Sequence, residues 1–205
     1  MSAPEGPVIT AAVEGDLDEF LLRSVVAHAG LTLGTVHGRK GKPFLLSSIQ
    51  GYNNAARFSP WVVLIDLNGD ADCAPEAISR WLPNPSRYMS LRVAIRAAEA
   101  WLLADRERIA RWLGLSVAQV PTHPDELVNP KQALIHLARR SPRRWPREDL
   151  VPRDGSGRSV GPLYTARMIE FIQDNVNGWR PTSAILVSDS LARCVARLRR
   201  FAEDI

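Results

Sequence analysis

Acid and amide side chains gather at the end of one hydrophobic segment. The segment "WVVLIDLNGDADC", residues 61–73, begins like a buried strand and ends with Asp66, Asn68, Asp70 and Asp72. Carboxylate and amide oxygens are the ligands that Mg²⁺ and Mn²⁺ prefer in proteins. Like charges so close together repel one another unless a cation lies between them. The pattern therefore indicates a divalent-metal site that begins at Asp66.

Two further acids follow other hydrophobic segments. Glu14 comes directly after "PVITAAV", and Glu99 lies a few residues past "SLRVAI". The carboxyl ends of parallel strands meet at one edge of a sheet, where functional groups collect. If the first and third strands are neighbours, Glu14 and Asp66 lie close together at this edge. The expected metal ligands are Glu14, Asp66, Asn68 and Asp70.

Other sites built from spaced acids fit the segment less well. An EF-hand loop beginning at Asp66 needs glycine at position six and glutamate at position twelve, where Ala71 and Ala77 stand. A phosphatase of the aspartyl-phosphate type needs a second carboxylate at the position of Asn68. Asn68 and Asp70 are also ordinary turn residues, so a purely structural turn stays open. The acid after the first strand favours the metal site.

Short apolar segments alternate with helical patterns over the first half of the chain, which predicts parallel strands joined by helices. The expected strands are residues 7–13, 31–37, 61–67 and 90–95. From about residue 114, prolines divide the sequence and no strand periodicity remains. We therefore expect an α/β fold with about four mainly parallel strands flanked by helices. This core spans residues 1–113, and an α-helical extension, residues 114–205, packs on it.

Three helical patterns have features that a structure can test. The basic loop "GRKGK" precedes a segment that we expect to form a broken helix. The pattern "RAAEAWLLADRERIARWLGL" predicts a helix interrupted near Asp105. The segment "SAILVSDSLARCVARLRRFAEDI" predicts one long final helix with a kink between Ser188 and Ser190.

Composition places the chain among globular proteins, since 45% of its 205 residues are hydrophobic and 23% are charged. No apolar run approaches the roughly 20 residues that span a bilayer, and the N-terminal sequence lacks the pattern of a signal peptide. We expect a cytoplasmic protein with no membrane partner. The two cysteines, Cys73 and Cys194, have no metal-ligand spacing and are expected to be free thiols.

Positive charge is concentrated in three stretches, residues 38–42, 139–149 and 193–200, although the net charge is only +4. Arginine supplies nearly all of it, because the chain has three lysines. Such stretches bind polyanions by counterion release, or they are simply solvated faces. The expected nucleic-acid contacts are Arg39, Lys40, Lys42, Arg92 and Arg96. Arg96 has a competing interpretation, an ion pair with Glu99 along one helical turn.

Taken together, these segments resemble a known family. "VEGDLDEFLL", followed by "LIDLNGD" after an intervening strand and helix, resembles the Toprim domain of topoisomerases, primases and OLD-type nucleases. That domain has a glutamate after its first strand and an Asp-x-Asp pair after its third. The segments "AIRAAEAWLLAD", "NPKQAL", "GPLY" and "SDSLARC" resemble a bacterial group of small Toprim-like proteins often encoded beside an ATPase. The first resemblance covers about half of the chain, and the second covers almost all of it.

The resemblance implies roles for individual residues. Glu14 corresponds to the Toprim glutamate, a metal ligand or general base, and Asp66 to the first metal-binding aspartate. Asn68 stands where the second aspartate is expected. This change removes one negative charge from the metal site, so either Asp70 takes its place or catalysis is impaired.

Two more residues gain catalytic roles from the resemblance. Glu99 corresponds to the further acid of OLD-like nucleases, and Lys131 to a lysine near the scissile phosphate. The implied activity is Mg²⁺-dependent or Mn²⁺-dependent hydrolysis of DNA or RNA, with an ATPase partner, in prokaryotic anti-phage defence or DNA processing. Two alternatives stay open: a non-catalytic Toprim-like module that binds nucleic acid or the ATPase, and a metal-dependent nucleotide phosphatase. The sequence leaves the choice of DNA or RNA, the activating trigger and homodimerisation open.

Overall fold

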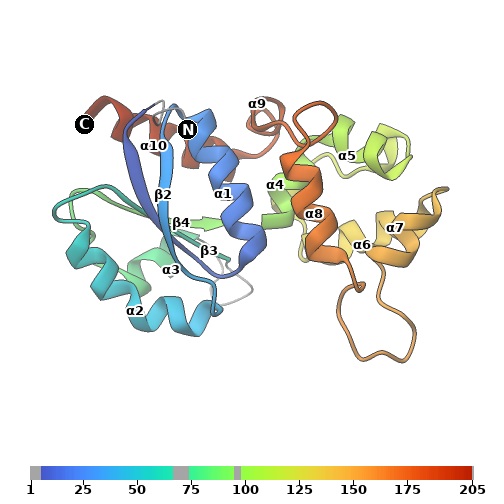
Figure 1. Ribbon diagram of the computed structural model, residues 1–205, viewed down its shortest axis with the longest axis horizontal. Coiled ribbons are helices and arrows are strands. Elements are labelled where there is room, and N and C mark those ends of the chain that lie inside the picture. The colour runs from blue at the N-terminus through green and yellow to red at the C-terminus, as the bar shows by residue number, and fades with distance from the viewer. Residues whose placement is uncertain (1–5, 67–73, 95–97, 205) are drawn as a thin grey trace. The chain divides into compact units, whose positions relative to one another are not determined.

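The computed structural model describes residues 6–66, 74–94 and 98–204. The chain forms two compact units, of which the first comprises Met1–Ile95 with Ser190–Ile205 and the second comprises Arg96–Asp189. Figure 1 labels the helices and strands of both units. Among the described residues, no helix combines the length and the apolar character needed to cross a membrane.

The first unit contains a sheet of four parallel strands in the order β2-β1-β3-β4. The strands are β1 (Val8–Val13), β2 (Thr32–Gly38), β3 (Trp61–Asp66) and β4 (Met89–Ala94). Every neighbouring pair is parallel, as the alternation of strands and helices predicts. The expected α/β fold with a four-stranded parallel sheet is therefore confirmed.

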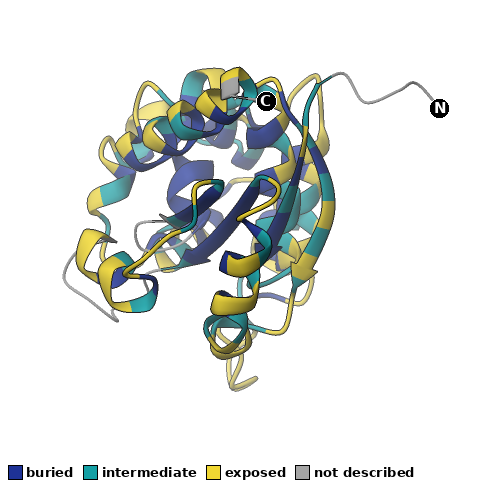
Figure 2. Cartoon of the chain, turned by 90° about the vertical axis from the view of Figure 1, so that its left-hand side faces the viewer, coloured by how far each residue is buried: buried dark blue, intermediate teal, exposed yellow. Residues whose placement is uncertain are grey.

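Hydrophobic residues explain which strands lie inside the sheet. In β3, five consecutive residues from Trp61 to Ile65 are buried, which is typical of a strand covered on both faces. In the edge strand β2, by contrast, Leu33 is the only buried residue, and residues 34–38 alternate between half-buried and exposed. The burial colours of Figure 2 show this difference between the central strands and the edge.

Helices cover both faces of the sheet. They are α1 (Asp16–His28), α2 (Lys42–Ala55), α3 (Ala74–Trp81) and α10 (Asp189–Asp204). Leu45 and Ile49 of α2 and Ile78 of α3 pack with Val63 and Ile65 of β3 in one hydrophobic core. On the other face, α1 and α10 meet where His28 lies 3.3 Å from Arg199 (Figure 1).

The segment after β2 differs from its prediction, because α2 is one continuous helix of 14 residues. The expected break was wrong. Leu45, Ile49 and Asn53 bury one side of this helix, and that packing outweighs the low helix propensity of Gly51, which is exposed. Pro43 falls in the first turn, where the lack of an N–H costs nothing.

The described part of the second unit is helical. Its helices are α4 (Ala98–Ala104), α5 (Arg106–Leu113), α6 (Pro130–Arg140), α7 (Arg144–Asp149), α8 (Tyr164–Gln173) and α9 (Pro181–Ala184). Short 3₁₀ turns occupy Val117–Gln119 and Pro124–Glu126. The structure gives no strand to any residue that it describes after β4, as the sequence predicts.

The predicted interruption at Asp105 is confirmed. This residue separates α4 from α5, and its carboxylate caps α5 by accepting the N–H of Arg108. The final helical segment is more divided than predicted, because α9 ends at Ala184 and α10 begins at Asp189. Ser188, which precedes α10 in the sequence, is fully buried, and its hydroxyl lies 2.9 Å from a carboxylate oxygen of Asp125.

Candidate functional site

The carboxyl edge of the sheet contains a topological switch point between β1 and β3. From β1 the chain continues to β2 on one side, and β3 lies on the other side. Open α/β sheets bind ligands just beyond such a point, because the adjoining loops diverge there. Val13 pairs with Leu64 near the end of the two strands, so Glu14 and Asp66 both lie at this edge.

Glu14 and Asp66 are in direct contact. Oε1 of Glu14 accepts a hydrogen bond of 2.8 Å from the backbone N–H of Asp66. The predicted proximity of these two acids, which are 52 positions apart in the chain, is therefore confirmed. Oδ1 of Asp66 is shielded from solvent. The edge thus carries two carboxylates, and one of them is partly fixed by the backbone of the other.

Lys42 places a cation at the same edge. It is the first residue of α2, and its ammonium donates a hydrogen bond to the backbone carbonyl of Asp66. The ammonium also lies 4.9 Å from the centre of the Trp81 ring. From the sequence, Lys42 was expected to contact nucleic acid as part of a basic loop. The structure places it beside the acids, a position that sequence reasoning did not predict.

The loop before α2 is held against the end of β1 and thereby positions Lys42. The N–H of Arg39 donates to the carbonyl of Val13 at 2.8 Å, and the N–H of Gly41 donates to the carbonyl of Glu14 at 3.0 Å. Gly38 has a φ of +88°, and a Cβ there would lie 2.4 Å from the carbonyl oxygen of Val13. A glycine is therefore required for this close approach.

The first turn of α1 also lies next to the switch point. Its acids complement the positive end of the helix dipole, and Asp18 accepts the N–H of Gly15 at 2.9 Å. Glu19 forms ion pairs with Arg23 at 2.8 Å and with Arg39 at 2.9 Å. Arg39, an expected nucleic-acid contact, is therefore held by an acid of α1 with its side chain half exposed.

The other expected nucleic-acid contacts lie in different surroundings. Lys40 is exposed, and its ammonium lies 4.9 Å from the centre of the Phe44 ring. Arg92 is half buried and donates to the hydroxyl of Ser90 at 2.9 Å. Burial, reinforced by repulsion from Arg197 and Arg200, lowers the pKa of Arg92. Arg96, and with it the alternative Arg96–Glu99 pair, lies outside the described residues.

Glu14 and Asp66 are suitable donors for a divalent metal, because both supply hard carboxylate oxygens at a ligand-binding position of the fold. Asn68 and Asp70 belong to residues 67–73, which lie outside the described part of the chain. Within the described part, no group of three or more His, Cys, Asp or Glu side chains is arranged to hold a metal. The donor chemistry therefore fits Mg²⁺ or Mn²⁺ for the two ligands that can be placed.

A second polar cluster lies in the second unit and unites two of the predicted catalytic residues. Glu99 of α4 is almost fully buried, and its Oε1 lies 3.4 Å from the ammonium of Lys131 in the first turn of α6. The same oxygen accepts a hydrogen bond of 3.0 Å from the hydroxyl of Tyr164. Three segments separated by more than thirty residues thus converge on one carboxylate.

Tyr164 had no predicted role, although it belongs to the "GPLY" segment of the resemblance. Burial, with smaller contributions from the charge and hydrogen bond of Glu99, raises the pKa of Tyr164 well above its ordinary value. The hydroxyl therefore stays protonated and acts as a donor to Glu99. The side chain of Lys131 is 42% exposed, so the cluster presents a cation to solvent while its acid stays inside.

Comparisons of the chain with protein-family models, with curated proteins and with solved structures give no match. The fold and the site define only a class, an α/β protein with an open parallel sheet. In this protein the switch point carries two carboxylates and a lysine.

Proposed function

We propose that the protein is a divalent-metal-dependent nuclease that hydrolyses phosphodiester bonds of DNA or RNA. The observation that carries the proposal is the contact between Glu14 and Asp66 at the switch point of the sheet. Acids at these two positions are what the resemblance to Toprim domains requires. By this contact the Glu14 carboxylate is held at the end of β3, where the carboxylate of Asp66 also lies.

The residues of the switch point have distinct roles in this proposal. Glu14 and Asp66 would hold the metal together with Asn68 and Asp70. When bound, the metal would polarise a phosphoryl oxygen and lower the pKa of a water molecule. Glu14 is already oriented by the N–H of Asp66, so its carboxylate needs little reorganisation to serve as a ligand or as a base. Lys42 supplies positive charge that favours the approach of a phosphate group.

Glu99 and Lys131 stay candidates for catalytic roles on the basis of the resemblance. Their ion pair and the Tyr164 hydrogen bond support a role beyond stability, because burying a carboxylate costs free energy that an apolar side chain would not.

A cleavage panel tests the proposed function. Plasmid DNA, linear DNA and total RNA are incubated with the protein and Mg²⁺ or Mn²⁺, and the wild type is compared with Glu14→Ala and Asp66→Ala. We expect cleavage by the wild type and none by either variant, while circular dichroism shows both variants folded. Cleavage that survives both substitutions would refute the proposed site.

The same panel separates the alternatives. Salt-dependent binding of nucleic acid without any cleavage would identify a non-catalytic module. Release of phosphate from mononucleotides, with polymers left intact, would identify a nucleotide phosphatase. An ATPase partner and a place in prokaryotic defence or DNA processing rest on the resemblance alone. The panel is therefore repeated with the product of the neighbouring gene.

A further inference from the structure

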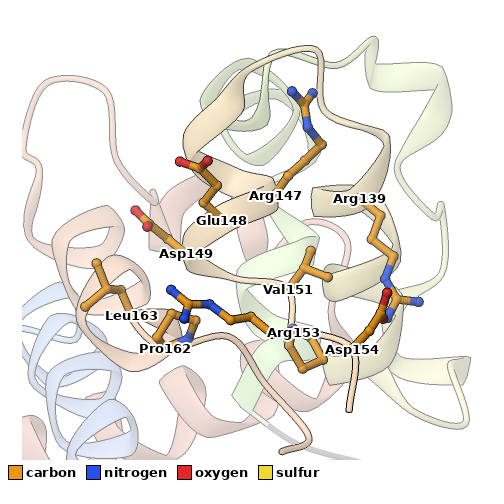
Figure 3. Close-up of a pocket in the computed structure, with 10 residues that line it drawn as sticks. Arg139, Arg147, Glu148, Asp149, Val151, Arg153, Asp154, Pro162 and Leu163 are labelled. Carbon is orange, nitrogen blue, oxygen red and sulfur yellow. The ribbon is translucent and has the colours of Figure 1, made fainter. Parts of the chain in front are cut away.

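The second unit contains a cavity of about 850 Å³ lined by arginines and acids (Figure 3). The end of α6 contributes Arg139, and α7 contributes Arg147, Glu148 and Asp149. The remaining lining comes from Val151–Asp154 and from Pro162 and Leu163. Four of the lining residues belong to the basic stretch 139–149, which the proposed site at the switch point does not use.

The wall of this cavity is fixed by the backbone. The N–H of Gly161 donates to the carbonyl of Leu150 at 2.9 Å, and the N–H of Leu163 donates to the carbonyl of Asp149 at 3.0 Å. These bonds close the base of the loop between α7 and α8. A Cβ at Gly161 would lie 2.3 Å from the carbonyl oxygen of Asp149, so the two segments pack without space for a side chain. The base of the loop that carries Arg153 is therefore fixed.

Two of the acids that line the cavity are neutralised by arginines that do not line it. Asp149 pairs with Arg167 at 2.8 Å, and Glu148 pairs with Arg144 at 2.7 Å. Asp154, the third acid of the lining, is exposed. The stretch 139–158 as a whole has seven arginines and three acids. The lining itself carries three arginines and three acids, and two of these acids are paired with Arg144 and Arg167 from outside it, so the arginines of the lining keep a surplus of positive charge.

Arg139 and Arg153 are the two cations suited to an external ligand. Figure 3 shows Arg139 extending from α6 along one wall, and Arg153 extending from the loop toward Pro162. Within the described chain, neither side chain has a hydrogen bond or an ion pair. Arg147 points away from them and donates to the carbonyl of Ser141, so its role is partly structural. Arginine suits phosphate because its planar donors bind two oxygens at once.

We propose that Arg139 and Arg153 bind phosphate groups of a nucleic-acid backbone at this cavity. The choice of a nucleic acid over other polyanions rests on the proposed nuclease function. An open cavity with exposed arginines matches backbone contacts, which position a nucleic acid without reading its sequence. Contact with this cavity would thus add affinity for the substrate whatever its bases.

The test measures binding in EDTA, where no metal-dependent cleavage can occur. Fluorescence anisotropy of short labelled single-stranded and duplex oligonucleotides is recorded over a range of salt concentrations. Arg139→Gln/Arg153→Gln is compared with Arg57→Gln/Arg111→Gln, which removes the same charge from exposed positions that lack side-chain bonds within the described chain. Inorganic phosphate serves as the competitor that represents a free-phosphate site.

We expect only the cavity variant to bind several-fold more weakly. Its plot of log affinity against log salt should lose a slope of about 1.4 on single strands and about 1.8 on duplexes, for two phosphate contacts. Equal losses in both variants, or displacement of the oligonucleotide by an equal concentration of inorganic phosphate, would overturn the inference. The measurement is repeated with Glu14→Ala. Weaker binding by Arg139→Gln/Arg153→Gln than by Arg57→Gln/Arg111→Gln supports a nucleic-acid site at the cavity even if every cleavage assay fails.

Discussion

The backbone N–H of Asp66 donates a hydrogen bond of 2.8 Å to the carboxylate of Glu14. One side chain thereby joins the ends of β1 and β3, the two strands on either side of the switch point. The bond satisfies a backbone donor at the end of a buried strand, where an unmade hydrogen bond would cost free energy. The Glu14 side chain therefore does two things that can be separated. Its oxygen accepts the hydrogen bond that joins the strand ends, and its negative charge is what a bound metal would require.

Substitution of Glu14 separates these properties. Glu14→Gln keeps an acceptor oxygen but removes the charge, whereas Glu14→Ala removes both. We expect Glu14→Ala to lower the free energy of unfolding by about 1–3 kcal/mol and Glu14→Gln to lower it by less than half as much. Both variants should lose Mg²⁺ affinity. Urea denaturation measures the stability, and titration calorimetry measures Mg²⁺ binding.

The control for Glu14 is Glu126→Gln, which removes one exposed carboxylate from a 3₁₀ turn of the second unit. It should leave both measurements unchanged. If Glu14→Gln binds Mg²⁺ as tightly as the wild type does, Glu14 is not a metal ligand. If Glu14→Ala is as stable as the wild type, the hydrogen bond to Asp66 contributes nothing to folding.

Removal of the Lys42 ammonium should raise Mg²⁺ affinity. Lys42 lies at the Asp66 carbonyl and repels any cation bound by the nearby carboxylates. We expect Lys42→Met to bind Mg²⁺ several-fold more tightly by calorimetry and to lose about 0.5–1.5 kcal/mol of stability with its hydrogen bond. Lys40→Met removes the same charge from the exposed neighbouring position and should change neither value. An unchanged or weaker Mg²⁺ affinity in Lys42→Met would argue against a metal at this edge.

A double-mutant cycle measures the coupling between Glu99 and Lys131. Lys131→Met leaves the buried carboxylate with its Tyr164 hydrogen bond but without the ammonium, so we expect it to cost about 2–3 kcal/mol. The cost should fall by about 1–2 kcal/mol when Glu99→Gln is already present, because a neutral amide needs no counter-ion. Urea denaturation of the four proteins gives the coupling. Strictly additive losses would show that the two residues act independently.

The elements that position the candidate site could be predicted from short-range patterns. Asp66 ends a run of five buried residues, and a fully buried strand reads as a continuous hydrophobic segment in the sequence. The break at Asp105 was predictable because aspartate prefers the position just before a helix. Both features depend on residues that are adjacent in the chain, so they can be predicted from the sequence alone.

The contacts within the two clusters depend on three-dimensional packing and were not predictable in detail. Lys42 reaches Asp66 because the preceding loop has positive φ angles at Gly38, Arg39 and Gly41, and a local pattern does not specify this combination. Tyr164 meets Glu99 across 65 positions of the chain. The helix α7 was not predicted as a separate element; its Pro146 falls in the first turn, where proline is tolerated.

The ion pair between Asp105 and Arg180 should be a major source of stability in the second unit. The guanidinium of Arg180 donates to both oxygens of the buried Asp105 carboxylate, at 2.9 Å and 2.7 Å. We expect Arg180→Ala to cost about 3–5 kcal/mol, since it leaves a buried charge without its counter-ion. Arg180→Lys keeps the charge without the two-pronged geometry and should cost less. Thermal and urea denaturation test this order, and equal losses in both variants would contradict the importance of the geometry.

The free energy of unfolding should fall at alkaline pH because of Cys194, whose burial in α10 raises the pKa of its thiol from 9.0 to about 12. The folded state therefore holds this proton more tightly than the unfolded state does. The resulting stabilisation is complete below about pH 9 and is lost as the pH rises toward about 12. Urea denaturation over this pH range should show that Cys194→Ala loses less free energy of unfolding at alkaline pH than the wild type does. The loss in each protein is measured from that protein's own value at neutral pH. Parallel pH profiles for the two proteins would show that the Cys194 thiol makes no such contribution.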